Sequence, residues 1–298
     1  MGTLGSKKEK WTLANGFLEH DDARTTASTV KNASNPATEP NDSPQPESVS
    51  PSPPRADQIT RWILIAIGIY TGLLVTLLNI FLLGSGKPID RAVILMADGL
   101  ILFWIVIGGS LTPMLRRKLV PKLIAIPIDW RVRFVLLCTA MALLEEVVTT
   151  TMTNLAPVFG TTPEEAHITA STNYLVVVCF HSVVVFVPMF IAWALMLSWW
   201  KFTPLKVLLL FGITGSLAEA SIQPSNLIGG FWVFVYGLMV YLPACTVPQD
   251  RPAKPPRWWS YPLAVVLPFP FVVLAAPVVL LRECWGSSFC QGCRRKRP

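Results

Sequence analysis

The chain has 298 residues, of which 52% are hydrophobic and only 14% are charged, and its mean hydropathy is +0.50. This composition excludes an ordinary soluble domain of this length and indicates a multi-pass membrane protein whose main partner is the lipid bilayer. The formal net charge of +7 lies in short loops and tails between apolar runs, which favours a role in membrane orientation and predicts no nucleic-acid partner. Protein partners are left open.

Residues 1–58 form the first predicted segment, a disordered cytoplasmic tail. They are rich in Pro, Ser, Asn and Thr, and Trp11 and Phe17 are their only aromatic residues, so the segment cannot bury enough apolar surface to fold. No apolar stretch follows the first methionine, and we expect the first membrane span to act as the targeting signal. Gly2 and Ser6 also fit the loose pattern for N-myristoylation, which stays open.

Seven apolar runs follow, and each has about the length of a transmembrane helix. They predict an all-α fold, a polytopic integral membrane helical bundle of about seven transmembrane segments within residues 59–283, followed by a short basic, cysteine-containing tail at 284–298. The last run contains four prolines, so it either spans the membrane or re-enters it, which would leave six spans. The runs cover approximately residues 62–83, 92–111, 134–156, 174–198, 205–223, 227–245 and 261–281.

The distribution of Lys and Arg predicts the orientation of the bundle. The loop at 157–173 has no basic residue and contains Glu164, Glu165 and His167, so we expect it on the non-cytoplasmic side. Seven spans would also place the basic residues 294–297 on that side, which is the reason for retaining the re-entrant alternative. The positive-inside rule puts the N-terminus in the cytoplasm together with the basic loops, which are those at 116–133, 201–206 and 251–257.

The third run holds two adjacent carboxylic acids, Glu145 and Glu146, near the middle of the membrane. A charged acid at that depth costs on the order of 2.5–3.5 kcal/mol, so such a residue usually faces the bundle interior and has a polar partner. Residues three, four and seven apart share a helix face, and this spacing places Glu146 on one polar stripe with Thr150 and Thr153. Because Glu145 is rotated by about 100° from that stripe, we predict that Glu146 is the inward-facing member of the pair.

Ionisable residues on four predicted spans lie at similar depths. Asp98, His181 and Glu219 are roughly 6–10 Å from the non-cytoplasmic surface, and Glu146 is roughly 15 Å from it, at ~1.5 Å per residue. Four such groups in one half of the bilayer are costly for packing alone, so we predict that they line a titratable polar cavity. The secondary polar residues expected around it are Glu145, Thr150, Ser216 and Gln223.

The fifth span also predicts a close helix contact. Gly212, Ser216 and Glu219 follow one helix face, and the pair Gly212-x-x-x-Ser216 provides a small-residue surface at which two membrane helices approach closely. We therefore expect Glu219 beside this contact rather than in lipid. On the fourth span, Pro188 predicts a kink.

Two kinds of chemistry use such a set of residues. Carboxylates and a histidine can relay protons or bind a cation in a transporter-like protein, which is the function that we favour. The same groups can activate water, with or without a metal, in an intramembrane hydrolase. A structural membrane protein without chemistry of its own is the third possibility, so whether the chain is an enzyme stays open. We predict no metal site, and cofactors are unknown.

The hydrolase alternative rests on a resemblance. The adjacent glutamates of the third span, with His181 on the next, resemble the CAAX-type membrane proteases, whose pattern joins Glu-Glu-x-x-x-Arg to Phe-x-x-x-His and a later His. In this chain Thr150 stands in place of the Arg and Val177 in place of the Phe, and Glu219 stands where the later His is sought. The resemblance covers three short stretches and implies glutamate- and histidine-dependent hydrolysis within the membrane.

Overall fold

The structure, a computed structural model, describes residues 55–275 and residue 277. Its elements are helices, and the β-structure in this part of the chain is limited to an isolated parallel bridge between Trp200 and Lys254. The all-α prediction is therefore confirmed. Residues 55–58 of the predicted N-terminal tail belong to the first helix, whereas the rest of that tail and the tail at 284–298 lie outside the described residues.

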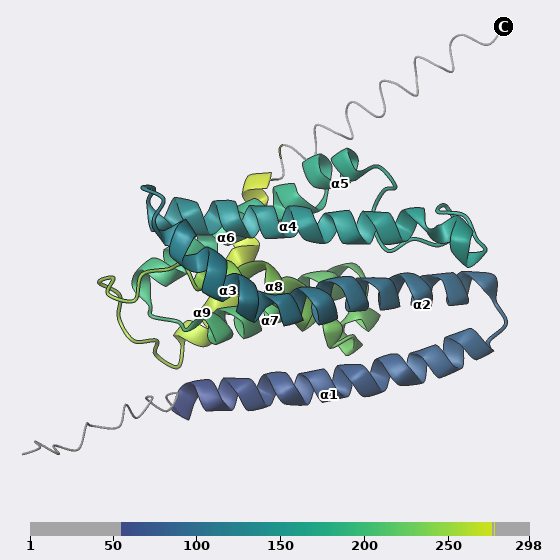
Figure 1. The fold of residues 1–298 in the computed structure, drawn as a ribbon, viewed down its shortest axis with the longest axis horizontal. Helices are drawn as coiled ribbons and strands as arrows, with labels where there is room; N and C mark the ends of the chain where they lie inside the picture. Colours follow the sequence, from purple (N-terminus) through teal and green to yellow (C-terminus); the bar gives the residue numbers. More distant parts are fainter. Residues whose placement is uncertain (1–54, 276, 278–298) are drawn as a thin grey trace, which may run out of the picture. The chain divides into compact units, whose positions relative to one another are not determined.

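Two long, antiparallel helical segments correspond to the first two predicted spans (Figure 1). The first is α1 (Arg55–Gly84), which ends shortly before a turn at Gly86, where φ is 72°. The second is one continuous helix, since the residues at its internal junctions keep right-handed helical torsion angles, and its middle part is π-helical. It consists of α2 (Pro88–Leu100), η1 (Ile101–Gly108) and α3 (Gly109–Ile124).

The second segment continues further than the hydropathy predicts. Arg116, Arg117, Lys118 and Lys122 were expected in a loop, but they lie on the last turns of α3. The helix continues several residues beyond the end of the apolar pattern. Straight-chain basic residues favour a helical conformation, and they allow α3 to extend into the polar headgroup region. The loop that follows is correspondingly short.

The third predicted span is α4 (Trp130–Asn154), and the short 3-10 helix η2 (Ala156–Phe159) follows it. Asp129 caps the start of α4, because its side chain accepts a hydrogen bond from the Arg131 backbone N–H at 2.8 Å. Asn154, at the other end, donates to the Thr172 carbonyl oxygen at 3.0 Å and so ties the following loop to the helix. The sequence therefore located this helix correctly.

The fourth predicted span is interrupted. It forms α5 (Tyr174–Phe180) and α6 (Ser182–Trp199), and His181 between them has non-helical torsion angles, φ −126° and ψ −84°. Pro188, where we expected the kink, lies inside α6. The interruption therefore occurs at an ionisable residue that no proline or glycine precedes, and the sequence gives no local signal for it.

The most extensive helix contact joins α7 (Pro204–Ile222) to α8 (Phe231–Ala244), which the short helix η3 (Pro224–Ile228) connects. A Cβ atom added at Gly212 would lie 2.2 Å from the Val233 carbonyl oxygen, and one added at Gly215 would lie 2.1 Å from the Tyr236 ring. The two backbones can approach this closely only because those side chains are absent. The close contact predicted at Gly212 is confirmed.

The last predicted span begins with α9 (Ser260–Val266), α10 (Pro268–Val272) and η4 (Val273–Ala275). α9 packs against α7, and α10 packs against α6. The run Ser260–Ala275 is an apolar helical stretch that is shorter than the roughly 20 residues of a full crossing. The remainder of the predicted run lies largely outside the described residues.

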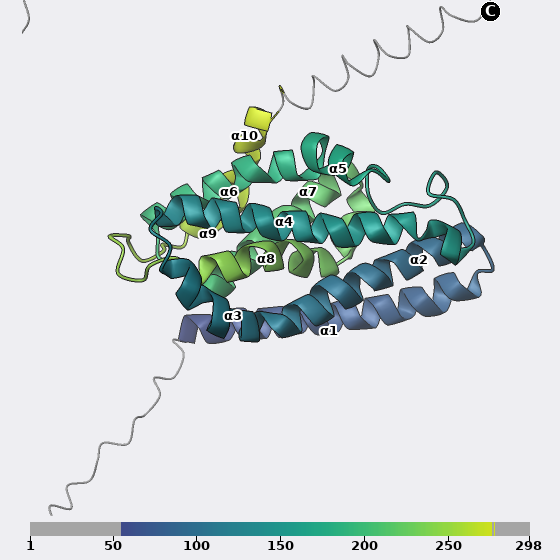
Figure 2. The ribbon, with the colours of Figure 1, turned by 45° about the horizontal axis from the view of Figure 1, so that its top comes forward.

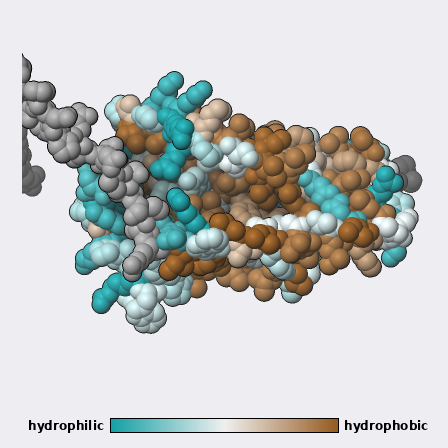
Figure 3. All heavy atoms as spheres, turned by 60° about the horizontal axis from the view of Figure 1, so that its bottom comes forward, coloured by the Kyte–Doolittle hydropathy of each residue, from teal (hydrophilic) through white to brown (hydrophobic). Residues whose placement is uncertain are grey.

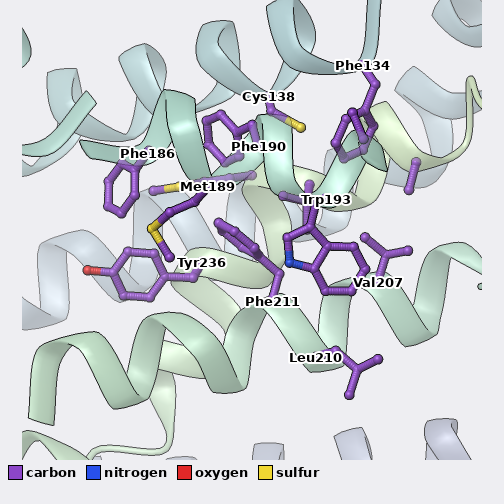
Figure 4. Close-up of a cluster of buried hydrophobic side chains, with 14 of the residues drawn as sticks. Phe134, Cys138, Phe186, Met189, Phe190, Trp193, Val207, Leu210, Phe211 and Tyr236 are labelled. Carbon is purple, nitrogen blue, oxygen red and sulfur yellow. The ribbon is translucent and has the colours of Figure 1, made fainter. Parts of the chain in front are cut away.

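A cluster of apolar side chains fills the space between α4, α6, α7 and α8. Figure 4 shows Phe134 and Cys138 of α4 above Phe190 and Trp193 of α6, with Phe211 of α7 below them. The Phe190 and Phe211 rings are 5.5 Å apart between centroids, in the range of favourable aromatic pairs. This core fixes the positions of the helices that carry the polar residues described below.

Within the described residues, four helices are long and apolar enough to cross a membrane. Large hydrophobic side chains are exposed along them, and in Figure 3 hydrophobic residues cover most of the visible face, with hydrophilic residues gathered chiefly at one end. Because a helix that is apolar around its whole circumference needs an apolar solvent, these features indicate an integral membrane protein with several spans. The four are Asp57–Gly84, Pro88–Ile124, Tyr174–Trp199 and Pro204–Ile222.

Two of the basic residues that serve as orientation markers are buried. Arg133 donates to the Ile124 carbonyl oxygen at 3.1 Å, and Arg251 donates to the Leu197 carbonyl oxygen at 2.8 Å. These carbonyls belong to the last turns of α3 and α6, whose C-terminal ends attract positive charge. Burial lowers the pKa of Arg251 from its ordinary value. Both arginines therefore stabilise helix ends, in addition to any effect on orientation.

Candidate functional site

Glu145 and Glu146 are both buried on α4, with side chains 5% and 4% exposed. The prediction that only Glu146 faces inward is therefore wrong. The reason is that α4 packs against both α6 and α8, so its buried face is wider than the single stripe that the spacing indicated. Thr150 and Thr153, which share the stripe with Glu146, are buried as well.

Glu146 interacts with two hydroxyl groups. The Thr149 hydroxyl donates to Oε2 of Glu146 at 3.2 Å, and the Ser182 side chain hydrogen-bonds to the same carboxyl group. Ser182 is the first residue of α6 and directly follows the interruption at His181. The break in the fourth predicted span therefore brings the start of α6 to the buried carboxyl group of α4.

Glu145 has a different environment. Its neighbours include Glu146 and Glu219, with which it interacts electrostatically. One helical turn beyond Glu146, the hydroxyl oxygen of Thr150 is likewise buried and has no hydrogen-bond partner in the described part of the chain. A buried hydroxyl group with no such partner is unusual in a packed protein.

Glu219 on α7 is the third carboxyl group of the site. The Tyr236 hydroxyl of α8 donates to its Oε1, and the Asn226 side-chain amide donates to its Oε2 at 3.4 Å. Asn226 belongs to η3, so the connection between α7 and α8 folds back onto the carboxyl group. We call Glu145, Glu146 and Glu219 the carboxylate cluster, because all three act electrostatically on the Tyr236 hydroxyl.

Aromatic rings form the apolar side of the carboxylate cluster. The Tyr236 ring lies 5.5 Å from the Phe186 ring and 5.8 Å from the Trp232 ring, between centroids. Figure 4 shows the Tyr236 hydroxyl pointing away from Trp193 and Phe211, so the ring belongs to the core while its oxygen reaches the glutamates. Apolar walls of this kind lower the local dielectric constant and strengthen the interactions between the charges.

Several residues predicted for the site have other partners. Asp98 accepts a hydrogen bond from the Asn79 side-chain amide of α1 at 3.0 Å. Ser216 is buried but donates to the Gly212 carbonyl oxygen of its own helix at 2.9 Å, and the exposed Gln223 donates to Ser225 at 2.9 Å. The structure thus brings together the glutamates of α4 and α7, whereas Asp98 links α2 to α1.

Four residues of these contacts were not predicted as site residues. They are Tyr236, Asn226, Ser182 and Asn79. A signal was available for Asn79, because an amide inside an apolar helix needs a partner in the membrane. For Tyr236 the signal was Gly215, since glycine on the facing helix leaves room for the ring.

The acidic loop after α4 has a structural arrangement of its own. Glu165 accepts hydrogen bonds from the Thr161 hydroxyl at 2.9 Å and from the Thr162 backbone N–H at 3.3 Å. These two bonds favour the ionised carboxylate and lower the pKa of Glu165. His167, in the same loop, is exposed. Neither residue contacts the carboxylate cluster through any hydrogen bond among the described residues.

Among residues 55–275 and 277, no three His, Cys, Asp or Glu side chains are grouped so that they could hold a metal ion. A hollow of about 290 Å³ lies at the turn between α1 and α2, where Lys87, Arg91 and Phe159 line it. The polar cavity that the sequence predicts around the glutamates stays a prediction.

Comparison of the chain with protein-family models, curated proteins and solved structures found no match. The CAAX-protease resemblance therefore has no support beyond the three stretches quoted above. The function is inferred from the residues of the site and their arrangement.

Proposed function

We propose that this protein is a transporter-like membrane protein that handles protons or another small cation through the carboxylate cluster. The observation that carries the proposal is the convergence of Glu145 and Glu146 from α4 with Glu219 from α7 around the Tyr236 hydroxyl of α8. Three carboxyl groups at one place are more than helix packing needs, because each is costly to bury in a membrane.

The arrangement favours the exchange of a positive charge. Three neighbouring carboxylates in a medium of low dielectric constant repel one another strongly, and a bound proton or cation relieves that repulsion. Hydrogen bonds from Thr149 and Asn226 stabilise the ionised forms of Glu146 and Glu219, so each group can both hold and release a proton. Thr150, whose buried hydroxyl has no hydrogen-bond partner in the described part, and Glu145, which lies beside two other carboxyl groups, are the groups through which we expect an incoming proton or cation to bind.

Helix interruptions next to the cluster support the same function. The fourth span is broken at His181, and α7 is separated from α8 by η3. Membrane transporters commonly use discontinuous helices at their ion sites, because unwound backbone supplies polar groups within the membrane. The π-helical part of the second segment also lies nearby, since Trp104 donates to the Val235 carbonyl oxygen of α8 at 3.0 Å; π-helical turns occur often at functional sites.

We further propose that about seven segments enter the membrane and that the N-terminus is cytoplasmic. Successive helices run in alternating directions, and the start of α1, the end of α3 and the start of α9 lie at one end of the described bundle (Figures 1 and 2). That end holds the basic residues 116–122, 201–206 and 251–257, which supports a cytoplasmic location. The 25-residue helix α4 has the length of a crossing, although its glutamates and threonines make it less apolar than the four candidate spans named above.

Proton flux into liposomes tests the proposed function. The purified protein is reconstituted with a trapped pH-sensitive dye, and a potassium diffusion potential drives protons inward. We expect proton entry well above that of empty liposomes, and we expect Glu146→Gln and Glu219→Gln to reduce it by about tenfold or more, because each removes one titratable group of the relay.

Glu164→Gln is the matched control, since it makes the same chemical change on an exposed glutamate of the loop. The control variant should conduct like the wild-type protein. Wild-type liposomes that acidify no faster than empty ones, or cluster variants that conduct as well as Glu164→Gln, would contradict the proposal.

A further inference from the structure

A second group of polar side chains lies at the basic end of the bundle, on three different helices. Arg116 of α3 hydrogen-bonds to the side chain of Tyr241 on α8, and Arg61 of α1 acts electrostatically on the same hydroxyl group. Both arginines are exposed, and Tyr241 is half-buried. Guanidinium groups from two separate helices thus act on one phenol.

Helix packing explains why these three residues meet. Gly68 of α1 faces Phe234 of α8, with 3.6 Å between its Cβ position and the ring, and Gly109 of α3 faces Leu238 at 3.8 Å. Residues seven apart share a helix face. Arg61 lies seven residues before Gly68, and Tyr241 lies seven residues after Phe234. Because α1 and α8 are antiparallel, these two residues lie opposite each other. On α3, which runs parallel to α8, Arg116 lies seven residues after Gly109 on the same face. Arg116 is therefore level with Cys245, one turn beyond Tyr241, and it acts electrostatically on both side chains.

No carboxylate in residues 55–275 or at 277 forms an ion pair with these two arginines. Within the described residues, the only ion pair joins Arg131 to Asp129. Asp57, the acid nearest to Arg61 in the sequence, accepts a hydrogen bond from the Thr203 hydroxyl at 2.7 Å. Two cations held near each other repel unless an anion lies between them, so the arrangement calls for a negatively charged ligand.

The position of the group identifies the kind of anion. Arg61 directly precedes Trp62, whose side chain is 63% exposed, and Arg116 follows the exposed Met114. Aromatic and basic residues at the ends of apolar spans lie at the level of the lipid headgroups. Only 6% of the residues in the most apolar stretch of Asp57–Gly84 are buried. Lipid chains can therefore lie directly against α1 beside the arginines.

We propose that Arg61, Arg116 and Tyr241 bind the phosphate headgroup of an anionic membrane phospholipid between α1, α3 and α8. Arginine binds phosphate oxygens through two parallel N–H groups, and the phenol adds a third donor. The acyl chains extend along the exposed apolar surfaces of α1 and α3 towards the middle of the membrane. This site is independent of the carboxylate cluster, and basic groups between transmembrane helices are typical binding sites for anionic lipids.

Native mass spectrometry of the full chain in detergent tests the site with phosphatidylglycerol as the probe. We expect the wild-type protein to retain phosphatidylglycerol in preference to phosphatidylcholine, and the double variant Arg61→Gln/Arg116→Gln to bind it about tenfold more weakly, as loss of two charge-assisted contacts implies. Arg117→Gln is the matched control, because it removes the neighbouring exposed charge of α3, which is rotated by about 100° from Arg116. It should bind lipid like the wild-type protein.

Two further measurements keep the outcomes distinct. Inorganic phosphate at millimolar concentration should not displace the lipid; if it does so fully, the site binds a free anion and the lipid proposal is wrong. Each variant is also checked for an unchanged unfolding midpoint, and Arg116→Lys, which keeps the charge but loses the paired contact, should bind with intermediate affinity. Equal retention of the two lipids, or an equal loss in Arg117→Gln, would overturn the proposal.

Discussion

Replacing Gly212 with alanine is expected to destabilise the protein by about 1–3 kcal/mol or more, in the range of overpacked sites. The added Cβ would lie 2.2 Å from the Val233 carbonyl oxygen and 2.8 Å from Cγ1 of Val233. The first of these atoms is backbone and cannot rotate away, so α7 and α8 must move apart. Their contact is the most extensive in the bundle, and it also holds Tyr236 against Glu219. The midpoint of thermal unfolding in detergent should fall by several degrees.

Gly72→Ala provides the matched control for this prediction. Gly72 lies on α1, and a Cβ atom added there has no heavy atom within 4 Å. This change should leave the midpoint unchanged or raise it, because alanine favours helix over glycine by up to about 1 kcal/mol. Equal midpoints for the two variants would show that α7 and α8 are not packed as closely as described.

Replacing Glu145 with methionine is expected to stabilise the protein, by about 1–4 kcal/mol as for other buried charges replaced with apolar residues. The Glu145 side chain is 5% exposed and lies beside Glu146 and Glu219. Methionine has a similar volume and removes both the buried carboxyl group and its repulsion with the neighbouring carboxylates. The gain should be larger at alkaline pH, where the carboxylates are ionised, than at acid pH. Thermal unfolding across a pH series measures both effects.

The same variant should lose proton flux, because a residue kept at a cost to stability usually serves a function. Glu164→Gln, on the exposed loop, should change neither the unfolding midpoint nor the flux. A Glu145→Met protein that is less stable than the wild type at every pH would show that Glu145 contributes favourable contacts, and the carboxylate cluster would then be structural.

Much of the fold could be predicted because the hydropathy and the length of a helix depend only on residues that are neighbours in the sequence. The runs at 134–156 and 205–223 agree with α4 and α7 within a few residues, and the small residue at Gly212 correctly indicated the close contact of α7. The break at His181 could not be predicted, since neither proline nor glycine marks it. It depends on tertiary contacts, among them the hydrogen bond from Ser182 to Glu146.

The site could be predicted only in part, for a related reason. Depth and helical phase predicted that Glu146 and Glu219 do not face lipid, and in the structure Glu146 is buried whereas Glu219 is partly exposed. Which residues meet across helices depends on rotation and register, and these are set by the packing of large side chains such as Tyr236 against Gly215. Asp98 therefore has a partner on α1 that depth alone did not indicate, and Glu145 is buried although its phase suggested otherwise.

Infrared difference spectroscopy of the protein in lipid, between acid and alkaline pH, tests most directly whether the carboxylate cluster exchanges protons. We expect a C=O stretching band of protonated carboxyl groups in an apolar environment, which shifts in deuterated water. This band should lose intensity in each of Glu145→Gln, Glu146→Gln and Glu219→Gln, and it should be unchanged in Glu164→Gln. Spectra that are the same for the wild-type protein and all four variants would contradict the proposal that the carboxylate cluster exchanges protons.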